Sequence, residues 1–140
     1  MIFTRRFFAG AMMTGALVVT GSLATGSLTP SWAANQATPF SAEAFKAAQA
    51  SGSPILVEIH ADWCPVCKAQ SPILDKLTAA PKFKDLKIFR VDFDSMKPVV
   101  KQFGAQMQST LIVFKGAAEQ GRSVGDSKEA SISALLDKSL

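Results

Sequence analysis

Hydrophobic and polar residues alternate along the chain with two different periods, which predict strands and helices in turn. Apolar, β-branched runs at 55–59 and 110–114 and an alternating run at 86–93 predict three strands, and 122–125 predicts a short edge strand. Between these runs, apolar residues recur at helical spacing. The predicted helices run from Ser41 to Ser51, from Pro65 to about Ala79, from Lys97 to Phe103, and from Ser127 towards the C-terminus.

The order of these elements predicts the fold class. From residue 41 it reads helix, strand, helix, strand, helix, strand, strand, helix, and residues 35–39 are predicted to be a short polar leader. Strand–helix alternation implies parallel pairing through crossovers, whereas the last two strands are close enough for an antiparallel hairpin. We therefore expect an α/β domain with a central mixed sheet flanked by helices. Ser41 and Ser127 are expected to cap helices, and Pro72 is expected to kink one.

The first 33 residues have the pattern of an export signal peptide. Arg5 and Arg6 precede a weakly apolar stretch, and Ser31-Trp32-Ala33 offers the small residues of a cleavage site. The paired arginines favour a twin-arginine signal cut before Ala34, while a Sec signal and an uncleaved membrane anchor stay open as alternatives. We therefore expect residues 34–140 to form one exported domain, located in the periplasm or another extracytoplasmic compartment.

The charge balance argues against a strongly basic function. The chain has 15 basic and 11 acidic residues, a net charge of +4. Two of the basic residues and none of the acidic residues fall within the predicted signal, so residues 34–140 carry a net charge of only about +2. This charge is too small to indicate nucleic acid or a membrane surface as the partner. The remaining chain suits one small domain, which we expect to be a monomer.

The only two cysteines, Cys64 and Cys67, lie where a predicted strand meets a predicted helix. The first N–H groups of a helix have no partner within it and carry partial positive charge, so they favour a thiolate. We predict that Cys64 is the nucleophile and that Pro65 occupies the first helical position, where no N–H donor is needed. Cys67 follows by about one turn, so its more buried thiol could resolve a mixed disulfide at Cys64.

Other roles for the cysteine pair are a structural disulfide or a metal site. A disulfide here would close a very short loop and remove little entropy from the unfolded chain. A structural zinc site usually has four cysteine or histidine ligands, and this chain has two cysteines and one histidine, His60. A weaker site, such as a copper site formed by Cys64, Cys67 and His60, is the main alternative to redox chemistry.

The run Trp63-Cys64-Pro65-Val66-Cys67-Lys68, followed by Pro72, resembles the W-C-x-x-C-K motif of the thioredoxin family. The resemblance covers nearly all of residues 40–140. It implies a thioredoxin-like fold and a thiol–disulfide oxidoreductase that exchanges dithiols with the cysteines of exported proteins. It also implies no cofactor beyond the Cys64–Cys67 disulfide. Nothing in the sequence resembles a flavin or nicotinamide site, so electrons for a reductase would come from another thiol protein, such as one embedded in the membrane.

The resemblance also assigns roles to residues outside the cysteine pair. Glu58 stands where thioredoxins carry a buried acid beneath the cysteines, which implies that it accepts the proton of Cys67. The same resemblance implies a substrate-binding surface near the cysteines. Its members would be Trp63, Pro65, Val66, Ser109 and Thr110.

Three positions depart from the thioredoxin pattern. Pro65-Val66 replaces the usual Gly-Pro, so the direction of the reaction stays open between reduction and oxidation. Ser109 replaces a cis-proline, and because a cis bond without proline costs about 2.5–4 kcal/mol, we expect the Gln108–Ser109 bond to be trans. His60 replaces an aromatic residue. It could be a polar surface residue, a group that stabilises the Cys64 thiolate, or a metal ligand.

Overall fold

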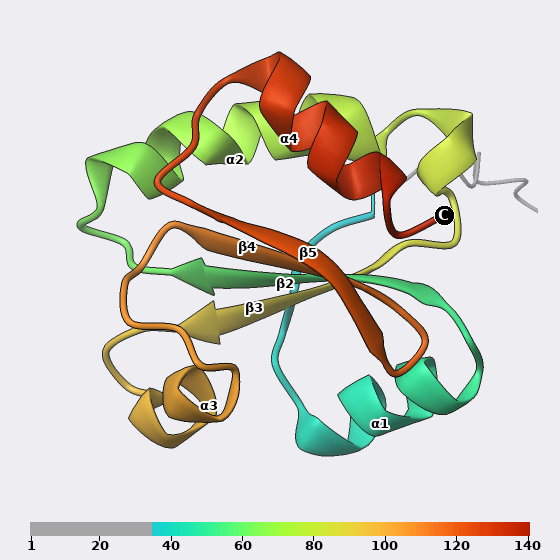
Figure 1. The fold of residues 1–140 in the computed structure, drawn as a ribbon. Coiled ribbons are helices and arrows are strands. Elements are labelled where there is room, and N and C mark those ends of the chain that lie inside the picture. Colours follow the sequence, from blue (N-terminus) through green and yellow to red (C-terminus); the bar gives the residue numbers. More distant parts are fainter. Residues whose placement is uncertain (1–34) are drawn as a thin grey trace, which may run out of the picture.

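The computed structural model describes residues 35–140 as a five-stranded sheet between two layers of helices (Figure 1). The predicted signal at 1–33 lies outside the described residues. The strands are β1 (Thr38–Pro39), β2 (Pro54–His60), β3 (Lys87–Asp92), β4 (Thr110–Lys115) and β5 (Ala118–Val124). The helices are α1 (Ala42–Ala50), α2 (Pro65–Thr78), the 3-10 turn η1 (Pro81–Phe83), α3 (Lys97–Gln102) and α4 (Glu129–Asp137). Within 35–140, no helix is both long and apolar enough to cross a bilayer.

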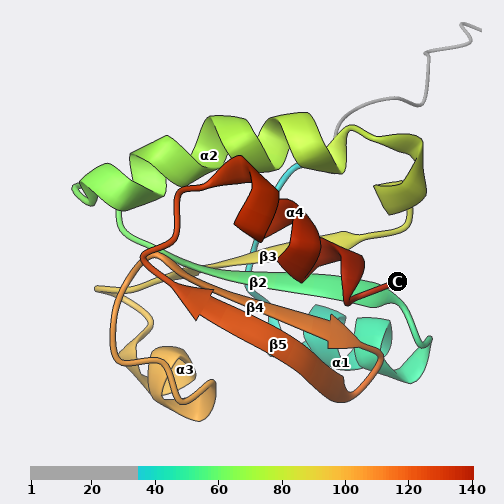
Figure 2. The ribbon, with the colours of Figure 1, turned by 45° about the horizontal axis from the view of Figure 1, so that its top comes forward.

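Strand β2 lies at the centre of the sheet, whose order is β1-β3-β2-β4-β5. It pairs in parallel with β3 and antiparallel with β4, so the predicted mixed sheet is confirmed. Helices α2 and α4 cover one face, and α1 and α3 cover the other (Figures 1 and 2). Every residue of β2 after Pro54 is buried, because neighbouring strands and helices enclose it on all sides. The central strand therefore holds whatever follows it in a fixed position.

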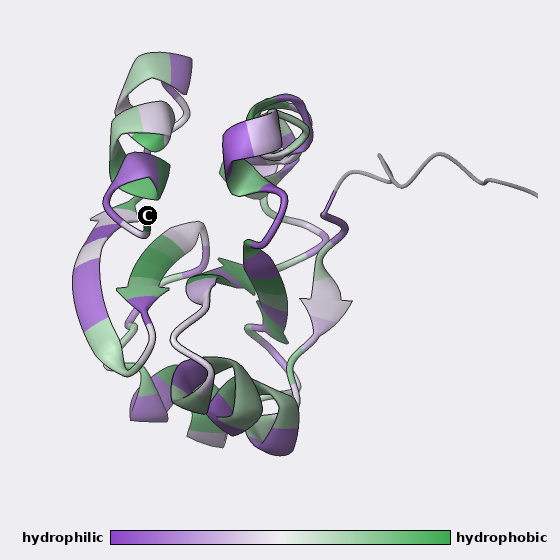
Figure 3. Ribbon diagram, turned by 90° about the vertical axis from the view of Figure 1, so that its right-hand side faces the viewer, coloured by the Kyte–Doolittle hydropathy of each residue, from purple (hydrophilic) through white to green (hydrophobic). Residues whose placement is uncertain are grey.

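Each face of the sheet carries its own apolar cluster, and hydrophobic residues concentrate on the central strands between the helices (Figure 3). On the α1 face, Phe45 is surrounded by four phenylalanine rings with centroids 5.3–5.7 Å away. On the opposite face, Leu56 of β2 packs in a cluster with Leu74 of α2 and Ile132 of α4. Residues 55–59 therefore contribute alternately to the two clusters, as expected for a central strand.

The predicted elements agree with the structure except at the edges of the sheet and at the start of the last helix. The polar leader contains β1, which is too short to show a period. It pairs in parallel with β3, and Thr38 Oγ1 also donates to the carbonyl of Ile88 (3.1 Å). Strand β5 begins at Ala118, earlier than predicted, because this exposed edge strand has no apolar run. The predicted Ser41 cap is confirmed, since its hydroxyl accepts from the Ala44 amide (3.4 Å).

The predicted start of the last helix is wrong by about one residue. Lys128 occupies the capping position of α4 and makes no side-chain cap. The carboxylate of Asp126 instead accepts a hydrogen bond from the Lys128 amide (2.9 Å), so the preceding loop ends in an aspartate turn. The second helix continues through Pro72, as its predicted length requires.

Replacing Phe45 by alanine is expected to bring the domain close to unfolding. The side chain touches four other rings, so its loss should cost about 3–5 kcal/mol out of a total stability of about 5–15 kcal/mol for such domains. Urea denaturation followed by circular dichroism measures the loss. Phe45→Leu keeps most of the buried volume and is the matched control, with a smaller loss. An alanine variant within about 1 kcal/mol of the original chain would contradict the packing described here.

Candidate active site

The cysteine pair lies at the junction that the sequence predicted. Strand β2 ends at His60, a short turn follows, and Cys64 is the capping residue of α2, with an extended backbone (φ −78°, ψ 116°). Pro65 takes the first helical position, where its missing N–H would have no partner in any case. The turn is closed by the Cys64 amide, which donates to the carbonyl of Ala61 (3.1 Å). The fold thus places Cys64 at the N-terminus of a helix that follows the buried central strand.

The sulfur of Cys64 accepts two hydrogen bonds from Cys67. The Cys67 amide donates to Cys64 Sγ at 3.1 Å, and the Cys67 thiol donates to the same sulfur at 2.6 Å. Both cysteines are free thiols, and both are buried, with 1% of Cys64 and 0% of Cys67 exposed. The two sulfurs need only a small movement to reach the disulfide length of about 2.05 Å.

Cys67 is held in its protonated form. Burial raises the pKa of the Cys67 thiol from 9.0 to about 11, and its hydrogen bond to Cys64 adds to the rise. The backbone amides of Ala61 and Ser109 act in the opposite direction on this pKa. At neutral pH, Cys67 therefore keeps its proton and donates it towards Cys64. This arrangement favours negative charge on Cys64 over Cys67, in the order expected for a nucleophile and its partner.

Glu58 lies beneath the cysteine helix, on the core side of β2. It lies two residues after Leu56 and therefore on the same face of β2, the one that α2 covers, and it is only 1% exposed. The Arg90 guanidinium donates from Nε to Oε2 of Glu58 (3.0 Å), and His60 Nδ1 lies 3.2 Å from Oε1. The expectation that Glu58 faces the core is confirmed, and Arg90 is a partner that the sequence analysis missed. Arg90 is the register partner of Glu58 on the neighbouring strand β3, which places the two side chains next to each other.

His60 is buried, so the first of its three suggested roles, a polar surface residue, is wrong. Its two ring nitrogens face carboxylates: Nδ1 lies 3.2 Å from Glu58 Oε1, and Nε2 lies 3.4 Å from Asp62 Oδ1. The suggested copper site would need this ring to join the two sulfurs. The part of the chain that the structure describes contains no group of three or more histidine, cysteine, aspartate or glutamate side chains arranged to hold a metal ion. The geometry therefore does not support that alternative.

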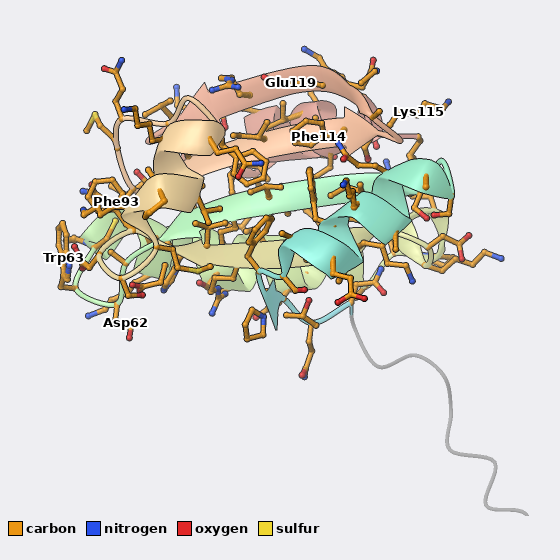
Figure 4. All side chains as sticks on the ribbon, turned by 90° about the horizontal axis from the view of Figure 1, so that it is seen from below. Asp62, Trp63, Phe93, Phe114, Lys115 and Glu119 are labelled. Carbon is orange, nitrogen blue, oxygen red and sulfur yellow. The ribbon has the colours of Figure 1, made fainter. Side chains whose placement is uncertain are left out.

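Trp63 lies beside Cys64 with 57% of its surface exposed. Its indole Nε1 donates to Asp94 Oδ2 at 2.7 Å, which fixes the ring on the surface. Asp62, Trp63 and Phe93 gather at one end of the molecule, opposite the end that carries Lys115 (Figure 4). Asp94 was not predicted as a site residue, because nothing in the sequence links it to a tryptophan 31 positions earlier. An exposed aromatic residue held in place beside a reactive sulfur can contact a polypeptide partner.

A family model described as thioredoxin matches residues 36–138. The chain belongs to the thioredoxin family. Thioredoxins are thiol–disulfide oxidoreductases, and the neighbouring sulfurs of Cys64 and Cys67 are the redox-active pair that such an enzyme needs. They work without a cofactor, using a redox-active disulfide.

Curated relatives and solved structures agree with this assignment. The chain is 32% identical over 95 residues to thioredoxin Asp f 29 of Aspergillus fumigatus, covering 67% of this chain and 86% of that protein. It is 36% identical over 94 residues to an H-type thioredoxin of Brassica campestris, covering 67% and 75%. The crystal structure of Trxlp from Edwardsiella tarda EIB202 superposes with a TM-score of 0.70 and 44% identity, covering 72% of this chain and 98% of that one.

Ser109 departs from the thioredoxin pattern in its backbone as well as its side chain. Its φ of +57° makes it the only non-glycine residue with positive φ among residues 35–140. A left-handed conformation costs a side-chain-bearing residue about 1–2 kcal/mol. The Ser109 carbonyl accepts from the Gly125 amide (3.0 Å) and from Gln70 Nε2 (3.3 Å), which offsets this strain. Because Ser109 and Thr110 are buried, they shape the loop beside the cysteines mainly through the backbone.

Gln70 links this loop to the cysteine helix and was missed by the sequence analysis. It lies on α2 one turn after Cys67 and is fully buried. Its Nε2 donates to the carbonyls of Ser109 and Asp126, the latter at 2.7 Å. The spacing of Cys67, Gln70 and Leu74 on one helical face was a signal that this glutamine is buried. Its two partners lie in other loops, Ser109 just before β4 and Asp126 just after β5, and could not be read from that spacing.

The raised pKa of Cys67 predicts that the reduced protein loses stability at high pH. Between about pH 9 and pH 11 the unfolded chain loses the Cys67 proton while the folded chain keeps it, so unfolding releases a proton. The contribution of this thiol to the free energy of unfolding is fully present below about pH 9. It is lost as the pH rises towards 11, by an amount on the order of 2 kcal/mol. Urea denaturation of the reduced protein at several pH values measures this decline.

Cys67→Ser is the control for that measurement, because it removes the titrating thiol and leaves the lysines that also titrate above pH 9. The reduced wild type should lose more stability than Cys67→Ser across this range. Parallel losses in the two proteins would show that the Cys67 proton is not retained by the fold.

Proposed function

We propose that this member of the thioredoxin family exchanges disulfides with the cysteines of exported proteins, with Cys64 as the attacking and Cys67 as the resolving thiol. The observation that carries the proposal is the pair of hydrogen bonds that Cys64 Sγ accepts from Cys67. Both donors stabilise negative charge on Cys64, and a thiolate, not a thiol, attacks a disulfide. The predicted export signal at 1–33 supports an extracytoplasmic location.

The reductive direction requires two displacements. First, Cys64 Sγ attacks one sulfur of a substrate disulfide, forms a mixed disulfide, and releases the other substrate sulfur as a thiolate that takes up a proton. Second, Cys67 loses its proton and attacks Cys64 Sγ, which forms the Cys64–Cys67 disulfide and releases the second substrate thiol. Two electrons pass from the cysteine pair to the substrate. The reverse sequence oxidises a substrate dithiol. In the reductive direction, the Cys64–Cys67 disulfide must be reduced again by another thiol protein, such as a membrane-embedded one.

Glu58 is proposed as the acceptor of the Cys67 proton in the second displacement. The Cys67 thiol is buried and its pKa is raised, so a nearby base must assist its ionisation. Glu58 supports this role because it is buried on the sheet face that α2 covers. Its bond from Arg90 keeps the carboxylate oriented in this position.

The substrate is proposed to bind along the surface formed by Trp63, Pro65 and Val66 and by the loop that ends at Ser109 and Thr110. Trp63 and Pro65 are exposed, and Met107 on the same loop is 54% exposed. These side chains offer apolar contacts, while Ser109 and Thr110 set the path of the backbone between them. An extended client chain with a disulfide would fit such an open surface better than a small molecule would.

Matched serine substitutions test the order of the two cysteines. Cys64→Ser should abolish reduction of insulin disulfides by dithiothreitol above the uncatalysed rate, because the attacking sulfur is gone. Cys67→Ser should attack normally but accumulate a mixed disulfide, visible by mass spectrometry, because nothing resolves it. If Cys64→Ser and not Cys67→Ser accumulated the mixed disulfide, or if Cys64→Ser kept full activity, the assigned order of the two cysteines would be contradicted.

A further inference from the structure

A buried proton acceptor needs a route to solvent, and the side chains around Glu58 offer one. Glu58 is 1% exposed, so its carboxylate cannot exchange protons with bulk water directly. Its Oε2 is bonded by Arg90, and an arginine keeps its proton in proteins. The other oxygen, Oε1, faces His60 Nδ1 at 3.2 Å. Histidine is the one neighbour that can accept a proton on one nitrogen and release another from the opposite nitrogen.

The opposite side of the His60 ring faces the surface. Its Nε2 lies 3.4 Å from Asp62 Oδ1, and the Asp62 side chain is 99% exposed. This distance is slightly longer than a usual N–H···O hydrogen bond, and the exposed carboxylate has room to approach the ring. Asp62 also lies at the end of the molecule that carries Trp63 (Figure 4). Glu58, His60 and Asp62 therefore form a continuous line of titratable groups from the buried strand to solvent.

We propose that His60 is a proton relay between Glu58 and solvent. This inference rests on the proposed function, in which Glu58 takes the proton of Cys67. The proton passes from Glu58 Oε1 to His60 Nδ1 while the proton on Nε2 passes to Asp62 and then to water. The ring changes from the neutral tautomer protonated on Nε2 to the neutral tautomer protonated on Nδ1, and no electrons move. When the cysteine pair is reduced again, a proton returns along the same path and restores the first tautomer.

The other charged groups near His60 do not offer the same route. Asp92 faces His60 from β3 as its register partner, but its Oδ1 accepts hydrogen bonds from the Ser95 amide (2.7 Å) and hydroxyl (2.5 Å). These bonds lower the pKa of Asp92 and hold it as a carboxylate bonded to Ser95. Arg90 is engaged with Glu58, and Lys68 on α2 is exposed. Asp62 is therefore the exit group.

The relay is tested by separating the two displacement steps in single-turnover experiments. Reduced protein is mixed with glutathione disulfide, quenched in acid, and analysed by mass spectrometry for the mixed disulfide and the Cys64–Cys67 disulfide. His60→Ala should form the mixed disulfide within about twofold of the wild-type rate and resolve it about tenfold more slowly or worse. Circular dichroism confirms that the variant is folded, and His60→Phe provides a second variant that fills the site.

Small-molecule rescue separates a relay from a space-filling role. Imidazole has two nitrogens that can take and release protons and should restore resolution in His60→Ala. 1-Methylimidazole fills similar space but has only one such nitrogen, so it should not. Equal rescue by both compounds, wild-type resolution in both His60 variants, or equal slowing of both steps would overturn the relay.

Two further outcomes distinguish the relay from the proposed function beneath it. If the wild type itself never resolves the mixed disulfide, the proposed function fails. If Glu58→Gln resolves at the wild-type rate, the relay has no proton to carry and is overturned, while the roles of the cysteines stand.

Discussion

The chemistry of the site depends on one contact, the hydrogen bond from the Cys67 amide to the sulfur of Cys64 at the first turn of α2 (3.1 Å). Amides at a helix N-terminus have no partner within the helix, and here one of them is directed at a nucleophile. The same turn places the Cys67 thiol 2.6 Å from that sulfur. One piece of helix geometry therefore stabilises charge on Cys64 and positions the thiol that later displaces it. Pro65 permits this arrangement because the first helical position needs no donor.

The rest of the fold fixes the position of that turn. Strand β2 is bonded on both edges and buried on both faces, so its end at His60 has little freedom to move. Gln70 ties the loop at Ser109 to α2, next to Cys67. Burial on this scale also has an electrostatic consequence, because it raises the pKa of Cys67 and isolates Glu58 from water. A site that protects its thiols in this way requires a defined path for the proton.

The elements that the sequence predicted well are those defined by local signals. The apolar run of β2, the capping hydroxyl of Ser41, and the proline after Cys64 each depend on neighbours within a few positions. Strand β1 depends on pairing with β3, far along the chain, and the full length of β5 depends on pairing with its hairpin partner β4. Neither pairing leaves a period in the residues of the strand itself. The exposed side of the sheet edge was therefore the least predictable part of the fold.

The candidate site divides along the same line. The cysteine spacing is a local pattern and Glu58 was assigned through the family resemblance, whereas the hydrogen bond from Gln70 to Ser109 joins residues 39 positions apart. His60 shows how close the two cases can be. Its place on the same strand face as Glu58, two positions away, could be read from the sequence. Its burial depends on the layers around β2, and this burial rules out a surface role.

The central claim is that hydrogen bonding, not exposure, makes the two buried cysteines different. Alkylation of the native reduced protein by iodoacetamide at pH 7, with each cysteine followed by mass spectrometry, tests this directly. Cys64 should react at least about tenfold faster than Cys67, although their exposed fractions are almost the same. Equal rates, or faster reaction at Cys67, would contradict it.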